Sequence, residues 1–238
     1  MLLGARQFFE VRNAPEPVKV LRFRSGIDAR SNVAFPNGDF TLCFWMKCYG
    51  LAGASDLFAF GWADGGWGGT RLMVSASRIY VRYATGSSAS QYDIYGHGSI
   101  VSDEQWHHYV IKLDGSSLTA SIDDSQILSK TISGSHQSDS IPFSIGSIGN
   151  DSNINARRGD KAIGFFCLFS RALSASEITD VRNSRKIDAG ASLYSDLVCG
   201  YELSNTTEMS NATGSNNLTL HNAYGAEVEY ADELPNGV

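Results

Sequence analysis

The 238-residue sequence has few cysteines, and their spacing argues against a metal-stabilised fold. The four cysteines are Cys43, Cys48, Cys167 and Cys199, and none forms a CxxC pair or a cluster with histidine, as zinc sites require. Cys43 and Cys48 lie five residues apart in a strand-like stretch, so their side chains face opposite sides and are not expected to pair. We expect buried free thiols, while a Cys167–Cys199 bridge stays open as an alternative.

Charged residues are also sparse, and the basic ones form no cluster. Charged residues make up 18% of the chain, the formal net charge is −6, and Arg157–Arg158 is an isolated pair rather than part of a basic run. Proteins that bind nucleic acid usually carry a basic patch or stripe. The sequence therefore predicts no nucleic-acid partner.

Long apolar runs are missing as well. No stretch approaches the length needed to span a bilayer. The opening MLLGARQFFEV has no basic start, and its apolar run stops at Arg6. These features predict neither a signal peptide nor a membrane segment, and we expect a protein made inside the cell.

What the sequence has in abundance is short runs of aromatic and β-branched residues, separated by turn signals. The chain is long enough to bury roughly 70% of its unfolded surface, so ordinary core packing can stabilise it. Asp114-Gly115 is a strong hairpin signal. The pattern predicts an all-β, two-sheet antiparallel sandwich or jelly roll, with strands at 18–23, 40–47, 56–62, 70–76, 78–84, 106–113, 117–123, 142–148, 161–170, 195–203 and 216–223.

One short helix is predicted within FSRALSASEITDVRN (169–183). Ser174 is followed three residues later by Glu177, which forms a capping box, and Leu173 and Ile178 can form a hydrophobic staple across it. Ile178 and Val181 then share one face at helical spacing. We expect this face to pack on the sandwich.

The strings VKVLRF, FTLCFWMK, EQWHHYVIKLDG (104–115), FSIGSIG (143–149) and GFFCLFSRALSASEI (164–178) occur in the order seen in one known family. They resemble the laminin-G-like jelly roll of the concanavalin A-like lectin/glucanase superfamily. In SIDD (121–124) an aspartate stands where that family often has glycine. The resemblance implies an N-terminal arm at 1–17, a laminin-G-like domain at 18–223 and a C-terminal tail at 224–238. Fold alone does not fix function.

A glycine-rich stretch with two tryptophans, GWADGGWGGTRL (61–72), is the candidate binding feature. An exposed tryptophan can stack on a sugar ring, and a carboxylate can accept hydrogen bonds from sugar hydroxyls. Core capping at a tight turn and burial between subunits are the alternatives. The candidate carbohydrate-binding residues are Trp62, Asp64, Trp67, Tyr83, Tyr92 and Tyr95.

The sequence contains only incomplete versions of the motifs expected for glycoside hydrolysis or metal binding. Glycosidases need two carboxylates across the scissile bond, and related hydrolases carry Glu-x-Asp-x-Glu on one strand. Here EVEY offers Glu227 and Glu229 near the end, without the central aspartate. His107 and His108 are adjacent on a strand, point to opposite faces, and are not expected to chelate a metal together. GNDSN (149–153) and Asp123–Asp124 could supply oxygens to calcium, although polar turns explain them better.

These observations predict a non-enzymatic structural and recognition module without a required cofactor. The favoured hypothesis is a virion protein, such as a bacteriophage head or tail accessory, made in the host cytoplasm. Its expected partners are other virion proteins or copies of itself, with weak glycan binding for host attachment. The alternative is a stand-alone carbohydrate-binding module, and a glycoside hydrolase ranks below both.

Overall fold

The structure of the protein is a computed structural model. The structure describes residues 20–23, 27–50, 55–60, 70–75, 78–85, 88–95, 103–133, 143–146, 160–184, 187–203, 210–222 and 229–231. These residues form two antiparallel sheets and one α-helix, as the sequence predicts. Within them, no helix has the length and apolar character needed to cross a membrane.

The first sheet, called sheet A, has the strand order β10-β9-β8-β3-β12-β1-β15. Strands β1 and β13 lie along the same edge of β12, because β3 occupies the other edge. The strands are β1 (Val20–Phe23), β3 (Phe40–Gly50), β8 (Trp106–Asp114), β9 (Ser117–Ile122), β10 (Ser125–Thr131), β12 (Asp160–Phe169), β13 (Leu197–Tyr201) and β15 (Glu229–Ala231).

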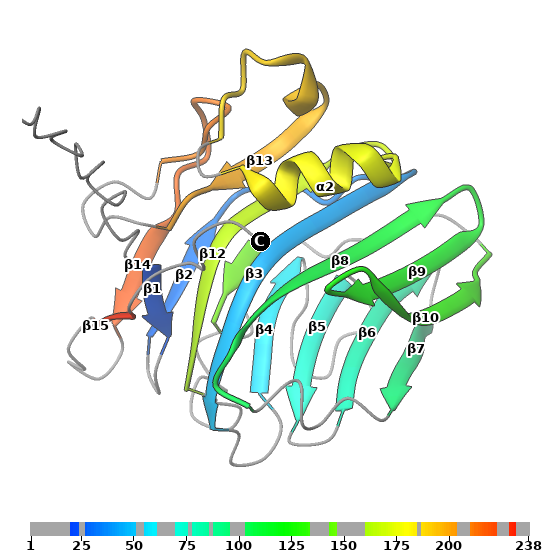
Figure 1. Ribbon diagram of the computed structural model, residues 1–238, viewed down its shortest axis with the longest axis horizontal. Coiled ribbons are helices and arrows are strands. Elements are labelled where there is room, and N and C mark those ends of the chain that lie inside the picture. The colour runs from blue at the N-terminus through cyan, green and yellow to red at the C-terminus, as the bar shows by residue number, and fades with distance from the viewer. Residues whose placement is uncertain are drawn as a thin grey trace, which may run out of the picture.

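The second sheet, called sheet B, has the strand order β14-β2-β11-β4-β5-β6-β7. Its strands are β2 (Ile27–Ser31), β4 (Ser55–Phe60), β5 (Thr70–Ser75), β6 (Arg78–Thr85), β7 (Ser88–Tyr95), β11 (Phe143–Ile145) and β14 (Thr219–Asn222). The two sheets pack face to face, as Figure 1 shows.

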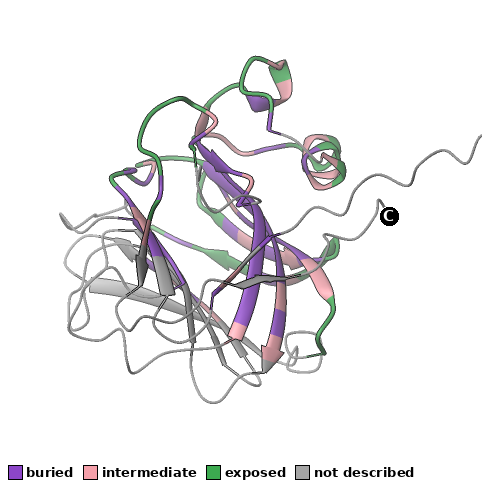
Figure 2. Cartoon of the chain, turned by 90° about the vertical axis from the view of Figure 1, so that its left-hand side faces the viewer, coloured by how far each residue is buried: buried purple, intermediate pink, exposed green. Residues whose placement is uncertain are grey.

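Helix α2 (Ala175–Asn183) and the short 3-10 helix η1 (Ser192–Tyr194) form a third layer. The helix crosses sheet A on the face turned away from sheet B, which is clearest where Figure 2 views it end-on. Ser174 is the N-cap, and both hydrogen bonds of the predicted capping box are present. Val181 is buried and Ile178 packs beside it, so the predicted helix face is confirmed.

The inner core lies between the two sheets and is rich in aromatic rings. Phe44 stacks on Tyr109 at a centroid distance of 5.3 Å, and Phe143 lies 5.3 Å from Phe166. These rings come from both sheets, so their burial joins the two layers.

A second apolar cluster, called the outer cluster, lies between sheet A and the third layer. Its buried members are Val20, Cys43, Trp45, Val110, Ala162, Phe165, Cys167, Phe169, Leu173, Val181, Ile187 and Tyr194. Strand β12 contributes to both clusters and is buried on both faces. A bulge between Gly164 and Cys167, with Phe165 at φ 47°, shifts which face each side chain occupies.

Several elements differ from the sequence prediction. Strands β2 and β10 were not expected, and residues 88–95 form a strand that the pattern left undefined. The predicted tail 224–238 includes β15, which pairs with β1 and so belongs to sheet A. Short polar strands such as β10 become strands because a neighbour supplies their hydrogen bonds, a tertiary effect that local pattern does not encode. The predicted arm 1–17 lies outside the described residues.

All four cysteines are free and buried, as expected. The open alternative of a Cys167–Cys199 bridge is wrong, because Cys167 faces the outer cluster and Cys199 faces the inner core. In the register, Cys199 lies opposite Leu168 instead. Burial raises the pKa of Cys43 and of Cys48 to about 12, so these thiols stay protonated and unreactive near neutral pH.

Candidate functional site: a groove beneath helix α2

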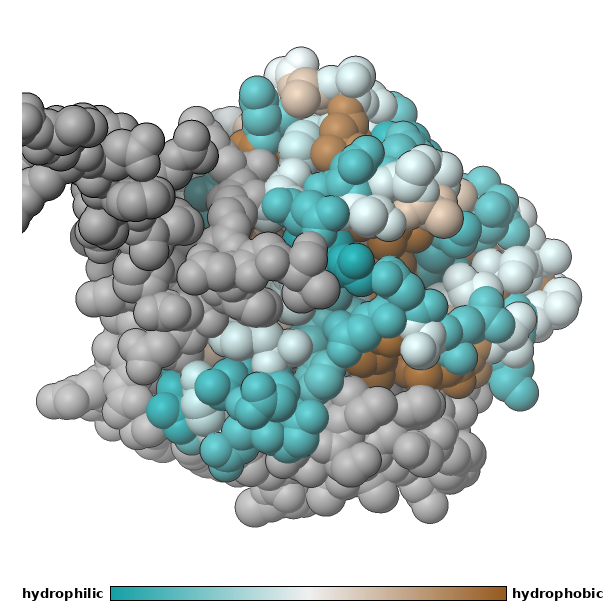
Figure 3. Space-filling model, in the orientation of Figure 1, coloured by the Kyte–Doolittle hydropathy of each residue, from teal (hydrophilic) through white to brown (hydrophobic). Residues whose placement is uncertain are grey.

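A groove with a volume of about 280 Å³ opens between α2 and the outer face of strands β8 and β9. In Figure 3, hydrophobic side chains are visible directly below the helix and hydrophilic ones border them. Its volume lies just below the range of about 300–1,000 Å³ that is typical of pockets for drug-sized ligands. The lining residues are Val110, Lys112, Thr119, Ala120, Ser121, Asp124, Gln126, Ala175, Ile178 and Thr179.

The β8–β9 hairpin supplies one wall of the groove, and its register fixes the chemistry there. Val110 pairs with Ser121, and Lys112 pairs with Thr119. Because side chains alternate along a strand, these four residues share the outer face, while Ile111 and Leu118 point into the inner core. The wall therefore combines one aliphatic side chain with two hydroxyls and one ammonium group.

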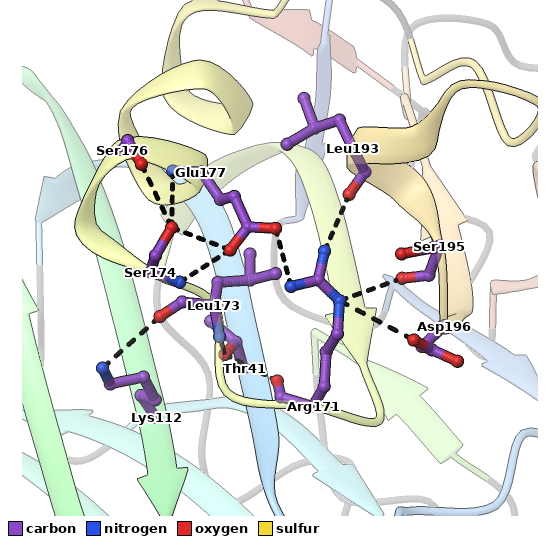
Figure 4. Close-up of polar contacts among 10 residues, drawn as sticks. All are labelled: Thr41, Lys112, Arg171, Leu173, Ser174, Ser176, Glu177, Leu193, Ser195 and Asp196. Carbon is purple, nitrogen blue, oxygen red and sulfur yellow. Dashed lines mark hydrogen bonds and ion pairs between the residues drawn. The ribbon is translucent and has the colours of Figure 1, made fainter.

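The opposite wall is α2, and a buried threonine fixes the segment that leads into it. The Thr41 hydroxyl, on strand β3, donates to the Arg171 carbonyl at 2.9 Å and accepts from the Leu173 amide at 2.8 Å. Leu173 is itself buried in the outer cluster. Figure 4 shows how these contacts tie the start of the helix to sheet A.

Arg171 joins α2 to the 3-10 segment beside it. Its guanidinium forms an ion pair with Glu177 at 2.8 Å and donates to the carbonyls of Leu193, at 3.2 Å, and Ser195, at 3.3 Å. The hydrogen bonds from Ser174 and the nearby Arg171 lower the pKa of Glu177. The carboxylate therefore stays ionised and keeps the cap in place at neutral pH (Figure 4).

At the far end of the groove, Asp124 forms an ion pair with Arg182 in the last turn of α2. Asp124 and Asp123 both adopt left-handed backbone conformations, with φ values of 65° and 47°. Aspartate tolerates this region less well than glycine. Positive φ at both positions is what a two-residue hairpin turn between β9 and β10 requires, and it places the Asp124 carboxylate against the helix.

His107 and His108 occupy opposite faces of β8, as predicted. His107 lies between two carboxylates, with its Nδ1 2.5 Å from Asp123 and its Nε2 3.1 Å from Asp103. The Asp123 carboxylate also accepts from the His108 amide at 2.9 Å, so these contacts hold the β9–β10 turn against the start of β8.

His108 is buried in the outer layer, with its ring 5.2 Å from that of Trp45. In the part of the chain that the structure describes, its Nδ1 has no hydrogen-bond partner. Burial first, and then the charge of Arg182, lower the pKa of His108 to about 4, despite the opposing charges of Asp124 and Asp123. The ring is therefore neutral at pH 7.

The residues predicted to bind sugar are not brought together by the described structure. Trp62, Asp64 and Trp67 lie outside the described residues, and for Tyr92 and Tyr95 the structure describes only the backbone, in β7. Tyr83 is 0% exposed and stacks on Phe40 in the inner core, so its ring offers no surface to a sugar. That part of the prediction is wrong, because Tyr83 faces the sandwich interior.

The positions considered for calcium give a similar result. GNDSN lies outside the described residues, and Asp123 and Asp124 are engaged by His107 and Arg182. Among the residues that the structure describes, no group of three or more histidine, cysteine or acidic side chains could hold a metal ion.

Sequence reasoning missed the groove. The only sequence feature that pointed to the groove was the alternation along 106–113 and 117–123, which places Lys112, Thr119 and Ser121 on the same outward face. It did not show that α2 lies across these residues, because a long-range contact between Thr41 and the 171–173 segment places the helix there.

A family model for laminin-G domains, described as the concanavalin A-like lectin/glucanases superfamily, matches residues 24–179. The chain belongs to this superfamily. No curated protein sequence matches it.

Solved structures share the fold of this superfamily member. A Bacteroides ovatus protein described as a candidate carbohydrate-binding protein aligns over 92% of this chain and 61% of its own length, at 13% identity and a TM-score of 0.68. The binding domain of Paraclostridial Mosquitocidal Protein 1 aligns over 68% of this chain and 42% of its own, at 19% identity and 0.50. Mouse laminin α1 domains LG4-5 align over 73% and 48%, at 13% identity and 0.50.

The chain thus spans 61% and 42% of the first two of these proteins. At such low identity the likeness establishes the sandwich architecture. By their descriptions the first is a carbohydrate-binding protein and the second a binding domain, and these roles bear on this chain only as a proposal.

Proposed function

We propose that this chain is a non-enzymatic recognition domain that binds carbohydrate. The observation that carries the proposal is a groove on a lectin-type sandwich whose lining mixes aliphatic carbons with hydroxyl, amide and charged groups. Sugars present the same mixture, with C–H faces and a rim of hydroxyls. The carbohydrate-binding description of the Bacteroides neighbour supports the same choice.

Recognition without hydrolysis is part of the proposal. Asp124 is the one carboxylate among the groove-lining residues, and Arg182 already pairs with it. Hydrolysis of a glycosidic bond normally needs two carboxylates on either side of the bond. Glu229 lies in β15 at the edge of sheet A, opposite Arg22, and Glu227 lies outside the described residues.

Display on a virus particle stays a prediction from the sequence. The named structural neighbours favour the carbohydrate-binding alternative over an assembly role. A virion setting would remain compatible with glycan binding, because many copies raise the avidity of a weak site.

The direct test is to probe the purified full-length protein on a glycan array, with the Trp62→Ala/Trp67→Ala double variant beside it. We expect the wild type to bind a defined set of glycans, and a reducing-sugar assay on the same glycans to show no release. Binding lost in the double variant would place the site in the 61–72 stretch rather than in the groove, which overturns the location inferred below. A folded wild type that binds no glycan would overturn the proposal, and product release would overturn its non-enzymatic part.

A further inference from the structure

We propose that the groove beneath α2 is the saccharide site, and that it takes a sugar unit bearing a carboxylate, with Lys112 as the charged partner. This inference rests on the proposed function, because it names the location and the ligand class of that recognition. The fold by itself specifies neither the location of the site nor the class of ligand. Three features of the groove lead to it.

The first feature is the weakly engaged ammonium group of Lys112. Its Nζ lies 3.4 Å from the Leu173 carbonyl and 3.9 Å from the Asp114 carboxylate, at the outer limits for a hydrogen bond and an ion pair. An ammonium group has three donors and attracts carboxylates as a point charge. The Asp114 side chain is 62% exposed, so water screens that pair. A ligand carboxylate at ordinary hydrogen-bonding distance from Nζ would interact more strongly with Lys112 than either of these two groups.

The second feature is the contrasting state of Asp124, the other charged lining residue. Its carboxylate already has a close partner in Arg182, which is held against the end of α2. The negative charge at that end of the groove is therefore matched by a cation. The unmatched capacity lies with Lys112, so the groove is better suited to an anionic than to a cationic sugar.

The third feature is the arrangement of the remaining lining. Ser121 and Gln126 offer hydroxyl and amide groups at the rim, while Val110 and Ile178 provide aliphatic carbons. Along β8 the lining runs from Val110 to Lys112, which is two residues or about 7 Å of strand. A groove this short and small fits one or two sugar rings rather than a long polymer segment.

The turn at Asp123–Asp124 is held in place by two ion pairs at this end of the groove. They join Asp123 to His107 and Asp124 to Arg182. They fix the rim of the groove in one shape before any ligand binds.

The test measures binding of the intact protein to matched pairs of oligosaccharides. Galacturonate, glucuronate, mannuronate and sialate oligosaccharides are each compared with the same compound after carboxyl reduction. The variants are Lys112→Met, which keeps the length of the side chain without its charge, and Asp114→Asn, which removes the competing carboxylate. Lys130→Met is the matched control, because Lys130 is exposed on β10 and does not line the groove.

We expect at least one acidic oligosaccharide to bind about tenfold or more tightly than its reduced form, the size of one charge-assisted hydrogen bond. Lys112→Met should abolish that preference, Asp114→Asn should increase it, and Lys130→Met should leave it unchanged. Added salt should weaken the acidic ligand more than the neutral one. A thermal unfolding scan of each variant confirms that it is folded.

The possible failures are distinguishable. Glycan binding with no preference for acidic members, or with the preference intact in Lys112→Met, overturns this inference and leaves the proposed function standing. A fourth variant, Ala175→Leu, fills the groove from the exposed first residue of α2. If it binds as the wild type does, the groove is not the site. If the wild type binds none of the glycans, both proposals are wrong.

Discussion

The inner core and the outer cluster are held together in different ways. The inner core is built from aromatic rings of facing sheets, such as Phe143 of sheet B against Phe166 of sheet A, and its stability comes from burial of apolar surface. The outer cluster is bordered by polar anchors, among them Thr41, Arg171 and Ser174. This difference indicates that the inner core determines whether the chain folds, whereas the polar anchors determine where α2 lies and so form the groove.

The most severe test of this contrast is Phe166→Ala in the inner core. The Phe166 ring is 0% exposed and lies 6.1 Å from Phe44 and 5.3 Å from Phe143, so truncation removes contacts to both sheets. We expect the free energy of unfolding to fall by about 3–5 kcal/mol. Urea titration followed by fluorescence and by far-ultraviolet circular dichroism measures it. A loss below about 1 kcal/mol would contradict the role given to the inner core.

Acid should weaken the outer layer through His108. The folded-state pKa of His108 is about 4, below its ordinary value of 6.5, so the unfolded chain takes up a proton first as the pH falls. The full stability is present above about pH 6.5 and declines toward pH 4. Between pH 7 and pH 5 we expect a loss of about 2 kcal/mol in the free energy of unfolding.

The control for this pH dependence is His108→Phe, which fills the same place beside Trp45 without a titrating group. Urea titrations of both proteins at pH 7 and pH 5 should show a much smaller decline for the variant. An equal decline in the two proteins would mean that other groups cause it. Arg182, Asp123 and Asp124 are the charges that face His108, and all three remain in the control.

The smallest effect is expected at the helix cap. In Ser174→Ala the Glu177 amide loses its side-chain acceptor, which should cost about 1 kcal/mol. Hydrogen exchange should accelerate in the first turn of α2 by more than in β8. Ser176→Ala is the comparison, because its hydroxyl contacts Ser174 at 3.1 Å and does not cap the helix. Equal changes in α2 and β8 would show that the outer layer does not open separately.

The fold was largely predictable from the sequence, and the reasons are local. Alternating apolar residues in FTLCFWMK and WHHYVIKL lead to β3 and β8, and Ser174 with Glu177 defines the start of α2. Strands β10 and β15 were not predictable in this way, since they are short and depend on pairing with β9 and β1. The inward orientation of Tyr83 could not be predicted either, because alternation along a strand defines two faces without showing which one is buried.

The sequence by itself determined the sandwich, the helix and its cap, and the opposite orientations of Cys43 and Cys48 and of His107 and His108. These depend on the period of two along a strand and on hydrogen bonds between residues close in the chain. Only the tertiary structure decided that the two faces of β12 would serve different clusters and that α2 would lie across the β8–β9 hairpin to leave a groove. Those outcomes depend on a bulge at Phe165 and on contacts such as Thr41 with Leu173, whose partners are 132 residues apart in the chain.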